Sequence, residues 1–174
     1  SDYLIYNMKI KNQSKGFTLV ETLVAITILI VSIAGPLTIA MNGLSSAILA
    51  RDQITASYLA QEAVEYIRNK RDENALQGSG WMTNISQCVS QECTVDVQSG
   101  GNPQVCGGGG GDPLKYNETT GFYNYSSGDI SRFVRSVSLT NIDTDEVQIV
   151  VTMNWVTGVL SRSFVIKENI FNWQ

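Results

Sequence analysis

The stretch that decides the fold is Gly16-Phe17-Thr18-Leu19-Val20-Glu21, together with the apolar run that follows it to about Met41. A leader with three lysines ends at the glycine, and a single carboxylate stands at the start of the hydrophobic segment (Lys9, Lys11 and Lys15; Glu21). Leu23 to Met41 is about twenty mostly apolar residues, which is enough to cross a hydrocarbon core of roughly 30 Å as a helix. We therefore expect a leader at 1–16 and a membrane helix at 17–41.

The charges around this segment predict its orientation and single out Glu21. The lysines lie only on its N-terminal side, so the positive-inside rule places residues 1–16 in the cytoplasm and the rest outside. A carboxylate within a membrane helix costs on the order of 3 kcal/mol on insertion scales, so Glu21 needs a partner.

This pattern resembles the processing site of class III signal peptides, found in type IV prepilins and in the pseudopilins of type II secretion. The resemblance implies that a prepilin peptidase cuts between Gly16 and Phe17, N-methylates Phe17 and leaves the helix on the mature chain. It also implies that Glu21, then the fifth residue, forms an ion pair with the α-amino group of Phe17 in a neighbouring subunit. The specific motif covers residues 16–21 and the apolar helix behind them.

Two other interpretations compete with this resemblance. A conventional secretory signal peptide would be cut beyond the apolar run, where Ser45-Ser46-Ala47 and Ala50 offer small residues. An ordinary signal anchor would not be cut at all. Both leave Glu21 without a role, and neither requires Gly16-Phe17 before it.

Composition narrows the possible functions. The chain has 174 residues, 43% of them hydrophobic, and a formal net charge of −4. That is room for one globular domain besides a membrane helix, without the basic excess that indicates nucleic-acid binding. The chain contains no histidine, which excludes Ser-His-Asp and Cys-His nucleophiles and histidine-liganded zinc. We expect no enzymatic activity, no cofactor and no metal.

The helix is predicted to continue from Phe17 to about Leu76, with a kink or a locally melted turn at Gly35-Pro36. The alternative is that a transmembrane helix simply tolerates the proline. Residues 42–76 form an amphipathic continuation that we expect to pack under a sheet, and Gln77-Gly78-Ser79-Gly80 ends it. Its predicted apolar stripe consists of Leu44, Ala47, Ile48, Ile54, Tyr58, Leu59 and Tyr66.

Residues 77–174 are predicted to form an extracytoplasmic globular β-domain, with an irregular Cys- and Gly-rich region at 81–125. Cysteines outside the membrane are expected to oxidise, and three cysteines allow three single pairings. The short loop favours Cys88–Cys93, with a modest stabilising effect. Cys106 is then free or linked between chains, and Gly107–Gly111 forms a flexible surface loop.

The last fifty residues indicate an antiparallel β-meander. The expected strands are Asp129–Leu139, Glu146–Val156 and Leu160 to about Phe171. Alternate residues from Val147 to Trp155 are apolar, which marks a sheet with one face for a helix to cover. Asn141, Asp143, Asp145 and Glu146 could supply oxygen ligands to calcium, but Asp and Asn are also what a turn between strands favours.

The prediction is an α+β, pilin-like fold: a long N-terminal helix, transmembrane in its first half and amphipathic in its second, packed on a C-terminal antiparallel β-meander. The stretch Gly121-Phe122-Tyr123-Asn124-Tyr125 and the closing Asn172-Trp173 also look, more diffusely, like minor pilins of the pilus-modification type. Together these resemblances imply a minor subunit of a type IV pilus-like filament. Its implied partners are the prepilin peptidase, other pilin subunits and the inner-membrane assembly platform. The implied location is the inner membrane, single-pass with a cytoplasmic N-terminus, and then a cell-surface filament. The alternatives are a type II secretion pseudopilin and an anchored or secreted extracellular binding domain that does not polymerise.

Overall fold

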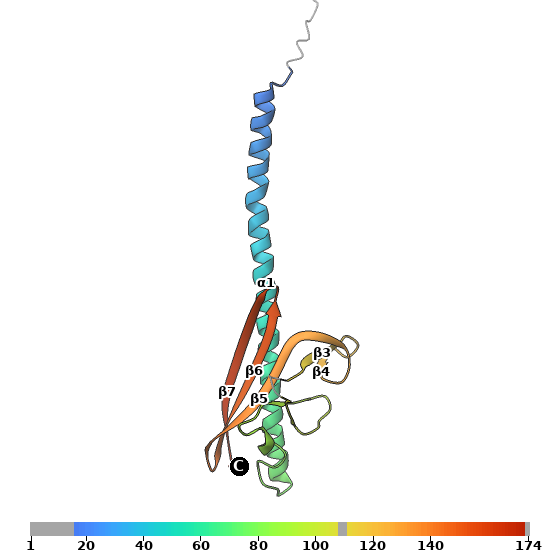
Figure 1. The fold of residues 1–174 in the computed structure, drawn as a ribbon, viewed down its shortest axis with the longest axis vertical. Helices are drawn as coiled ribbons and strands as arrows, with labels where there is room; N and C mark the ends of the chain where they lie inside the picture. Colours follow the sequence, from blue (N-terminus) through green and yellow to red (C-terminus); the bar gives the residue numbers. More distant parts are fainter. Residues whose placement is uncertain (1–15, 108–110, 173–174) are drawn as a thin grey trace, which may run out of the picture. The chain divides into compact units, whose positions relative to one another are not determined.

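The computed structural model describes residues 16–107 and 111–172. They fall within two compact units, Ser1–Ser46 and Ala47–Gln174. The leader expected at 1–16 lies outside the described residues except for Gly16. The architecture is α+β, with one long N-terminal helix, α1, and a C-terminal antiparallel sheet of seven strands (Figure 1). This confirms the predicted fold class.

Helix α1 runs from Leu19 to Leu76, close to the predicted 17–76. Its backbone is helical through Gly35 and Pro36, so the locally melted turn expected as one possibility is not formed. Proline removes a single backbone donor, and the uninterrupted apolar helix on both sides tolerates that local loss. The kink itself stays a prediction.

The C-terminal end of α1 is set by Gly78, which lies within the predicted stop at 77–80. Gly78 has a φ of +68°, a conformation that glycine adopts without a steric penalty. Its N–H donates to the carbonyl of Ala75 (3.0 Å), and the N–H of Ser79 donates to the carbonyl of Asn74 (3.0 Å). This pair of bonds is the Schellman motif, which satisfies carbonyls that the last helical turn would otherwise leave unpaired.

The predicted meander is present at the C-terminus. It consists of β5 (Asp129–Asp143), β6 (Glu146–Thr157) and β7 (Leu160–Phe171), with β6 between the other two. Strand β5 continues four residues past the predicted end at Leu139, because its pairing with β6 resumes across an irregularity after Asn141. The alternate apolar residues of β6 from Val147 to Trp155 are all buried, as their period-two pattern predicted.

The region 81–125 is more regular than the sequence indicated. It contains a 3₁₀ turn, η1 (Ser86–Cys88), and four short strands. The strands all belong to the same sheet: β1 (Cys93–Thr94), β2 (Gln104–Val105), β3 (Pro113–Asn117) and β4 (Phe122–Asn124). Both β1 and β3 pair with β5. Strands of two to five residues are too short to show periodicity. Strands β1 and β3 form on the edge of β5 that β6 does not take, because it has donors and acceptors to pair, and β2 and β4 then pair with β1 and β3.

The prediction of which helix face is buried was wrong for most positions. Of the predicted stripe only Leu59 and Tyr66 are buried, whereas Ile54 is 57% and Tyr58 is 68% exposed. The buried apolar residues of α1 are three alanines and four larger side chains (Ala56, Leu59, Ala60, Ala63, Val64, Tyr66 and Ile67). These join the buried side chains of β5 and β6 in one core. The predicted stripe left out the three alanines, whose small side chains let the helix backbone lie close to the sheet.

Candidate functional site

The expected cleavage position lies immediately before α1. Gly16, Phe17 and Thr18 are not helical, and α1 begins at Leu19. The Phe17 side chain is 75% exposed, and nothing lies within 4 Å of the place where a Cβ on Gly16 would be. The Gly16–Phe17 peptide bond is therefore outside the helix and, within the described part of the chain, uncovered.

Thr18 caps the start of the helix. Its hydroxyl accepts a hydrogen bond from the backbone N–H of Glu21 (3.3 Å), and its carbonyl accepts one from the N–H of Thr22 (3.1 Å). A threonine followed three residues later by glutamate is the sequence pattern of a capping box. A carboxylate in the first turn also interacts favourably with the positive end of the helix dipole. The sequence prediction missed this cap, although T-x-x-E directly before an apolar run was visible.

The side-chain polar groups of α1 from Leu19 to Met41 separate into two kinds. Each hydroxyl donates to a helix carbonyl three or four residues earlier, at 2.8 to 2.9 Å (Thr22, Thr27, Ser32 and Thr38). These groups need no partner from outside the helix. The Glu21 carboxylate has no hydrogen-bond or ion-pair partner among the described residues. Among the side-chain polar groups of this segment, the Glu21 carboxylate is the one without a hydrogen-bond partner inside the helix.

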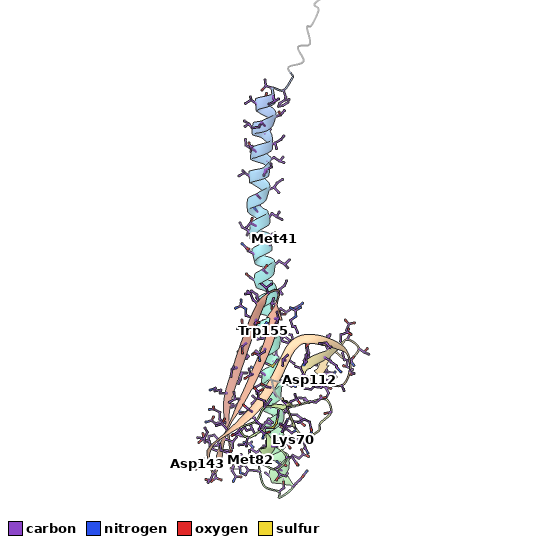
Figure 2. The ribbon with its side chains drawn as sticks, viewed as in Figure 1. Met41, Lys70, Met82, Asp112, Asp143 and Trp155 are labelled. Atoms are coloured by element: carbon purple, nitrogen blue, oxygen red, sulfur yellow. A yellow bond between two sulfur atoms is a disulfide. The ribbon has the colours of Figure 1, made fainter. Side chains whose placement is uncertain are left out.

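The surroundings of Glu21 are apolar and uncovered. Along the apolar stretch of α1 that is long enough to span a membrane, no residue is buried. The side chains up to Met41 radiate from the helix (Figure 2), and Leu19, Val20 and Leu23 are each more than half exposed. Helix α1 is therefore long and apolar enough to cross a membrane, and its segment before Met41 exposes apolar surface that lipid or other helices would cover.

In the second unit, the carboxylate of Asp52 is satisfied within the chain. Asp52 lies on α1 and is 2% exposed. Its Oδ2 accepts hydrogen bonds from Arg132 Nη1 (2.8 Å) and Thr157 Oγ1 (3.0 Å). These partners come from β5 and β6, so the residue joins the helix to two strands. The sequence alone did not identify it.

Arg135 makes a second polar connection between α1 and the sheet. It lies on β5, is 1% exposed, and forms an ion pair with Glu62 of α1 at 2.7 Å. Its guanidinium also donates to the carbonyls of Leu59 (2.8 Å) and Val95 (2.7 Å). A buried charge is tolerated only when it is paired and hydrogen-bonded in this way.

The cysteines agree with the pairing that the spacing favoured. Cys88 and Cys93 form a disulfide with Cα atoms 5.6 Å apart, and Cys106 is free. Burial raises the pKa of the Cys106 thiol, and the charges of Glu92 and Asp112 raise it further. The thiol therefore stays protonated near neutral pH, which is the unreactive form.

The oxygen ligands weighed for calcium lie at and beside the turn between β5 and β6, with Asn141 and Asp143 in β5, Asp145 in the turn and Glu146 in β6. Asp143 accepts from the N–H of Thr144 at 2.7 Å, and Asp145 accepts from the side-chain amide of Asn172 at 2.8 Å. The first bond is typical of a hairpin turn, and the second joins the turn to Asn172, which follows β7. No group of three or more His, Cys, Asp or Glu side chains suited to a metal occurs among the described residues.

Comparison with known proteins bears on the N-terminal segment alone. A family model described as the prokaryotic N-terminal methylation motif matches residues 11–35. No curated protein and no solved structure shows significant similarity to the chain. The match includes Gly16, Phe17 and Glu21, so the chain carries a type IV pilin-like N-terminal signal.

Proposed function

We propose that the chain is a structural subunit of a type IV pilus-like filament. A prepilin peptidase cuts between Gly16 and Phe17 and methylates the new amine, and the mature chain polymerises through α1. The observation that carries the proposal is the methylation motif at 11–35, placed on a helix whose apolar surface is uncovered and whose one carboxylate before Met41 lacks a partner among the described residues.

The uncovered peptide bond supports the processing step. A peptidase must hold its substrate in an accessible, non-helical backbone, and Gly16, Phe17 and Thr18 precede the helix. After cleavage Thr18 would still cap α1, because its two bonds are to Glu21 and Thr22 on the retained side. The cut therefore removes the leader without unwinding the helix that assembly needs.

The proposed assembly step depends on the Glu21 carboxylate, which has no ion-pair partner among the described residues. Before export the helix spans the inner membrane with its N-terminus in the cytoplasm, and an unpaired carboxylate there is costly. Cleavage creates one new cation, the α-amino group of Phe17. Two opposite charges about 4 Å apart, in surroundings less polar than water, attract by several kcal/mol. A neighbouring subunit's amine would satisfy Glu21 and set the axial register of the filament.

The proposed subunit has no catalytic activity, since Gly16 and Phe17 are substrate positions for another enzyme. Its other partners are further pilins and the inner-membrane assembly platform, and its β-domain, residues 77–174, faces outward. We further propose that it is a minor component of the filament. The ratio of this subunit to the main subunit in purified filaments tests this.

Mass spectrometry of the protein from its native membrane tests the proposal. The expected mature chain begins with N-methylated Phe17. A chain that begins between Ala47 and Arg51 would instead indicate a secretory signal peptide, and an intact leader would indicate a signal anchor. Either result contradicts the filament function.

A further inference from the structure

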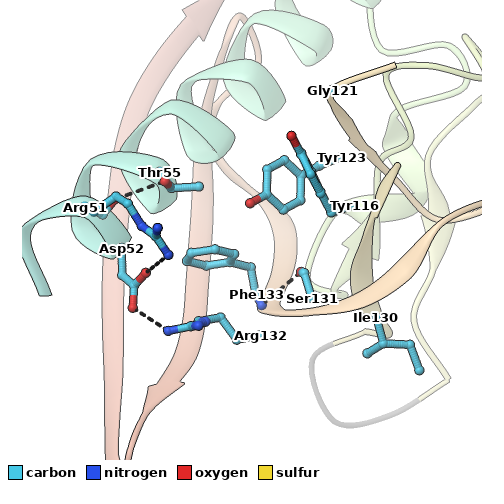
Figure 3. A pocket seen from close by; sticks show the side chains of 10 residues that line it. All are labelled: Arg51, Asp52, Thr55, Tyr116, Gly121, Tyr123, Ile130, Ser131, Arg132 and Phe133. Atoms are coloured by element: carbon cyan, nitrogen blue, oxygen red, sulfur yellow. Dashed lines mark hydrogen bonds and ion pairs between the residues drawn. The ribbon is translucent and has the colours of Figure 1, made fainter. Parts of the chain in front are cut away.

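We propose that a groove on the second unit binds a ring-shaped ligand that carries one carboxylate group. The groove is open to solvent and has a volume of about 870 Å³ between α1 and strands β3, β4 and β5. Arg51 and Asp52 line it from the helix, and Tyr116, Tyr123, Arg132 and Phe133 line it from the strands (Figure 3). This inference does not depend on the proposed filament function.

The charges of the groove leave one guanidinium group available. The Asp52 carboxylate is committed to Arg132, whose Nη1 lies 2.8 Å from its Oδ2, and to the hydroxyl of Thr157. Arg51 reaches the same carboxylate only at 3.9 Å, and its side chain is 74% exposed. Two cations thus share one anion, and the Arg51 fork keeps its donors free for a ligand.

Aromatic rings form the opposite wall. The ring centroids of Tyr116 and Tyr123 are 5.0 Å apart, and those of Tyr123 and Phe133 are 5.9 Å apart. In Figure 3 the rings of Tyr116 and Tyr123 lie close together on the far side of the groove, and the Phe133 ring lies between them and Arg51. Neither tyrosine hydroxyl has a hydrogen-bond partner among the described residues. Burial is the main cause that raises the pKa of Tyr123, so its hydroxyl stays neutral and can donate.

This arrangement matches a specific ligand chemistry. A guanidinium fork binds a carboxylate through two parallel hydrogen bonds, and aromatic walls bind the flat or apolar face of a ring. The volume lies within the range of about 300–1,000 Å³ that is usual for small-molecule sites. The two free hydroxyls would hold polar substituents of the ligand and fix its orientation.

Charge also limits the ligand to a single negative group. The groove has a local excess of one positive charge, from Arg51 and Arg132 against Asp52, so one carboxylate neutralises it. The whole chain carries a net charge of −4, which repels a polyanion at long range. Two classes of compound that carry one carboxylate on a ring are uronic-acid sugars and aromatic acids, and the experiment separates them.

The test is a titration of the full-length chain in detergent micelles with two matched pairs of compounds. The first pair is a methyl glucuronide and the corresponding methyl glucoside, and the second is benzoate and benzyl alcohol. We expect the acid of at least one pair to bind about tenfold or more tightly than its neutral partner, because a charge-assisted hydrogen bond is worth that factor. A preference in the first pair identifies a sugar acid, and one in the second identifies an aromatic acid.

The decisive variant is Arg51→Gln, which removes the free charge at an exposed position and should leave the fold intact. It should abolish the preference for the acid. The matched control is Arg162→Gln, which removes an equivalent charge from an exposed residue of β7 outside the groove and should keep the preference. The proposal is overturned if neither acid binds better than its neutral partner, or if Arg51→Gln retains the preference.

Discussion

Two carboxylates on the same helix have opposite environments. Asp52 is 2% exposed, and both its guanidinium and hydroxyl partners lie within the chain. Glu21 is exposed and has no partner among the described residues, although it stands in an apolar segment where an unpaired charge is costly. The second unit pairs its own buried charges, whereas the first leaves the Glu21 carboxylate without a partner among the described residues.

The same contrast applies to apolar side chains. In α1 beyond Ala47, small residues are buried against the sheet and complete a core within the chain. In α1 before Met41, no residue is buried. If this contrast is correct, substitutions in the second unit change the free energy of unfolding, and substitutions in the first change assembly instead. The predictions below are ordered by their expected effect on the free energy of unfolding.

The largest loss is expected for Arg135→Ala. The substitution leaves Glu62 and the carbonyl of Val95 without their buried partner, and such losses cost about 3–5 kcal/mol. Urea unfolding of the full-length chain in detergent measures it. Arg135→Met is the matched control, because it keeps the apolar stem, and its loss should be smaller. A change below about 1 kcal/mol for Arg135→Ala would show that this connection is not needed.

Removal of the disulfide should have an intermediate effect. The cysteines are five positions apart, and closing so short a loop stabilises by about 2 kcal/mol in the chain-entropy model. The double variant Cys88→Ala/Cys93→Ala should lose about that amount, and reductant should no longer change its unfolding midpoint. Cys106→Ala, at the free cysteine, is the control and should change the free energy by less than about 0.5 kcal/mol.

Asp52→Asn should cost less. The amide keeps a hydrogen bond to Thr157 but loses its charge opposite Arg132, whose side chain is 43% exposed, so we expect a loss of about 1–2 kcal/mol. The control is Asp72→Asn, which breaks the more exposed pair with Arg71 and should cost no more than about 0.5 kcal/mol. Equal effects at the two positions would mean that burial of Asp52 does not matter.

The sequence predicted those parts of the fold that repeat with a clear period. The apolar run and the alternation in β6 defined α1 and the meander to within a few residues. The four short strands between Cys93 and Asn124 were not predicted, because strands this short derive their stability from the strands they pair with and not from their own pattern. Ala56, Ala60 and Ala63 were also missed, since alanine does not reveal whether it is buried.

The candidate site was predictable to different degrees. Gly16, Phe17 and Glu21 were predicted because a motif of fixed spacing marks them, and the Thr18 cap could have been predicted from the same stretch. Asp52 and Arg135 were not found, because a charge in a helix or strand normally indicates a solvent-facing position. The oppositely charged groups that pair with them, on Arg132 and Glu62, are 80 and 73 residues away in the sequence, so only the folded chain brings them together.

The central claim is that Glu21 acts between chains, and the most direct measurement is its incorporation into filaments. Glu21→Ala and Glu21→Gln, each expressed beside the wild-type chain, should be inserted and cleaved but largely excluded from purified filaments. Their free energies of unfolding should stay within about 0.5 kcal/mol of the wild type. Glu65→Ala, at an exposed carboxylate of the second unit that pairs with Arg68 at 3.6 Å, should enter filaments normally. Wild-type incorporation of Glu21→Ala would contradict the account, because assembly would then rest on apolar helix packing without the ion pair.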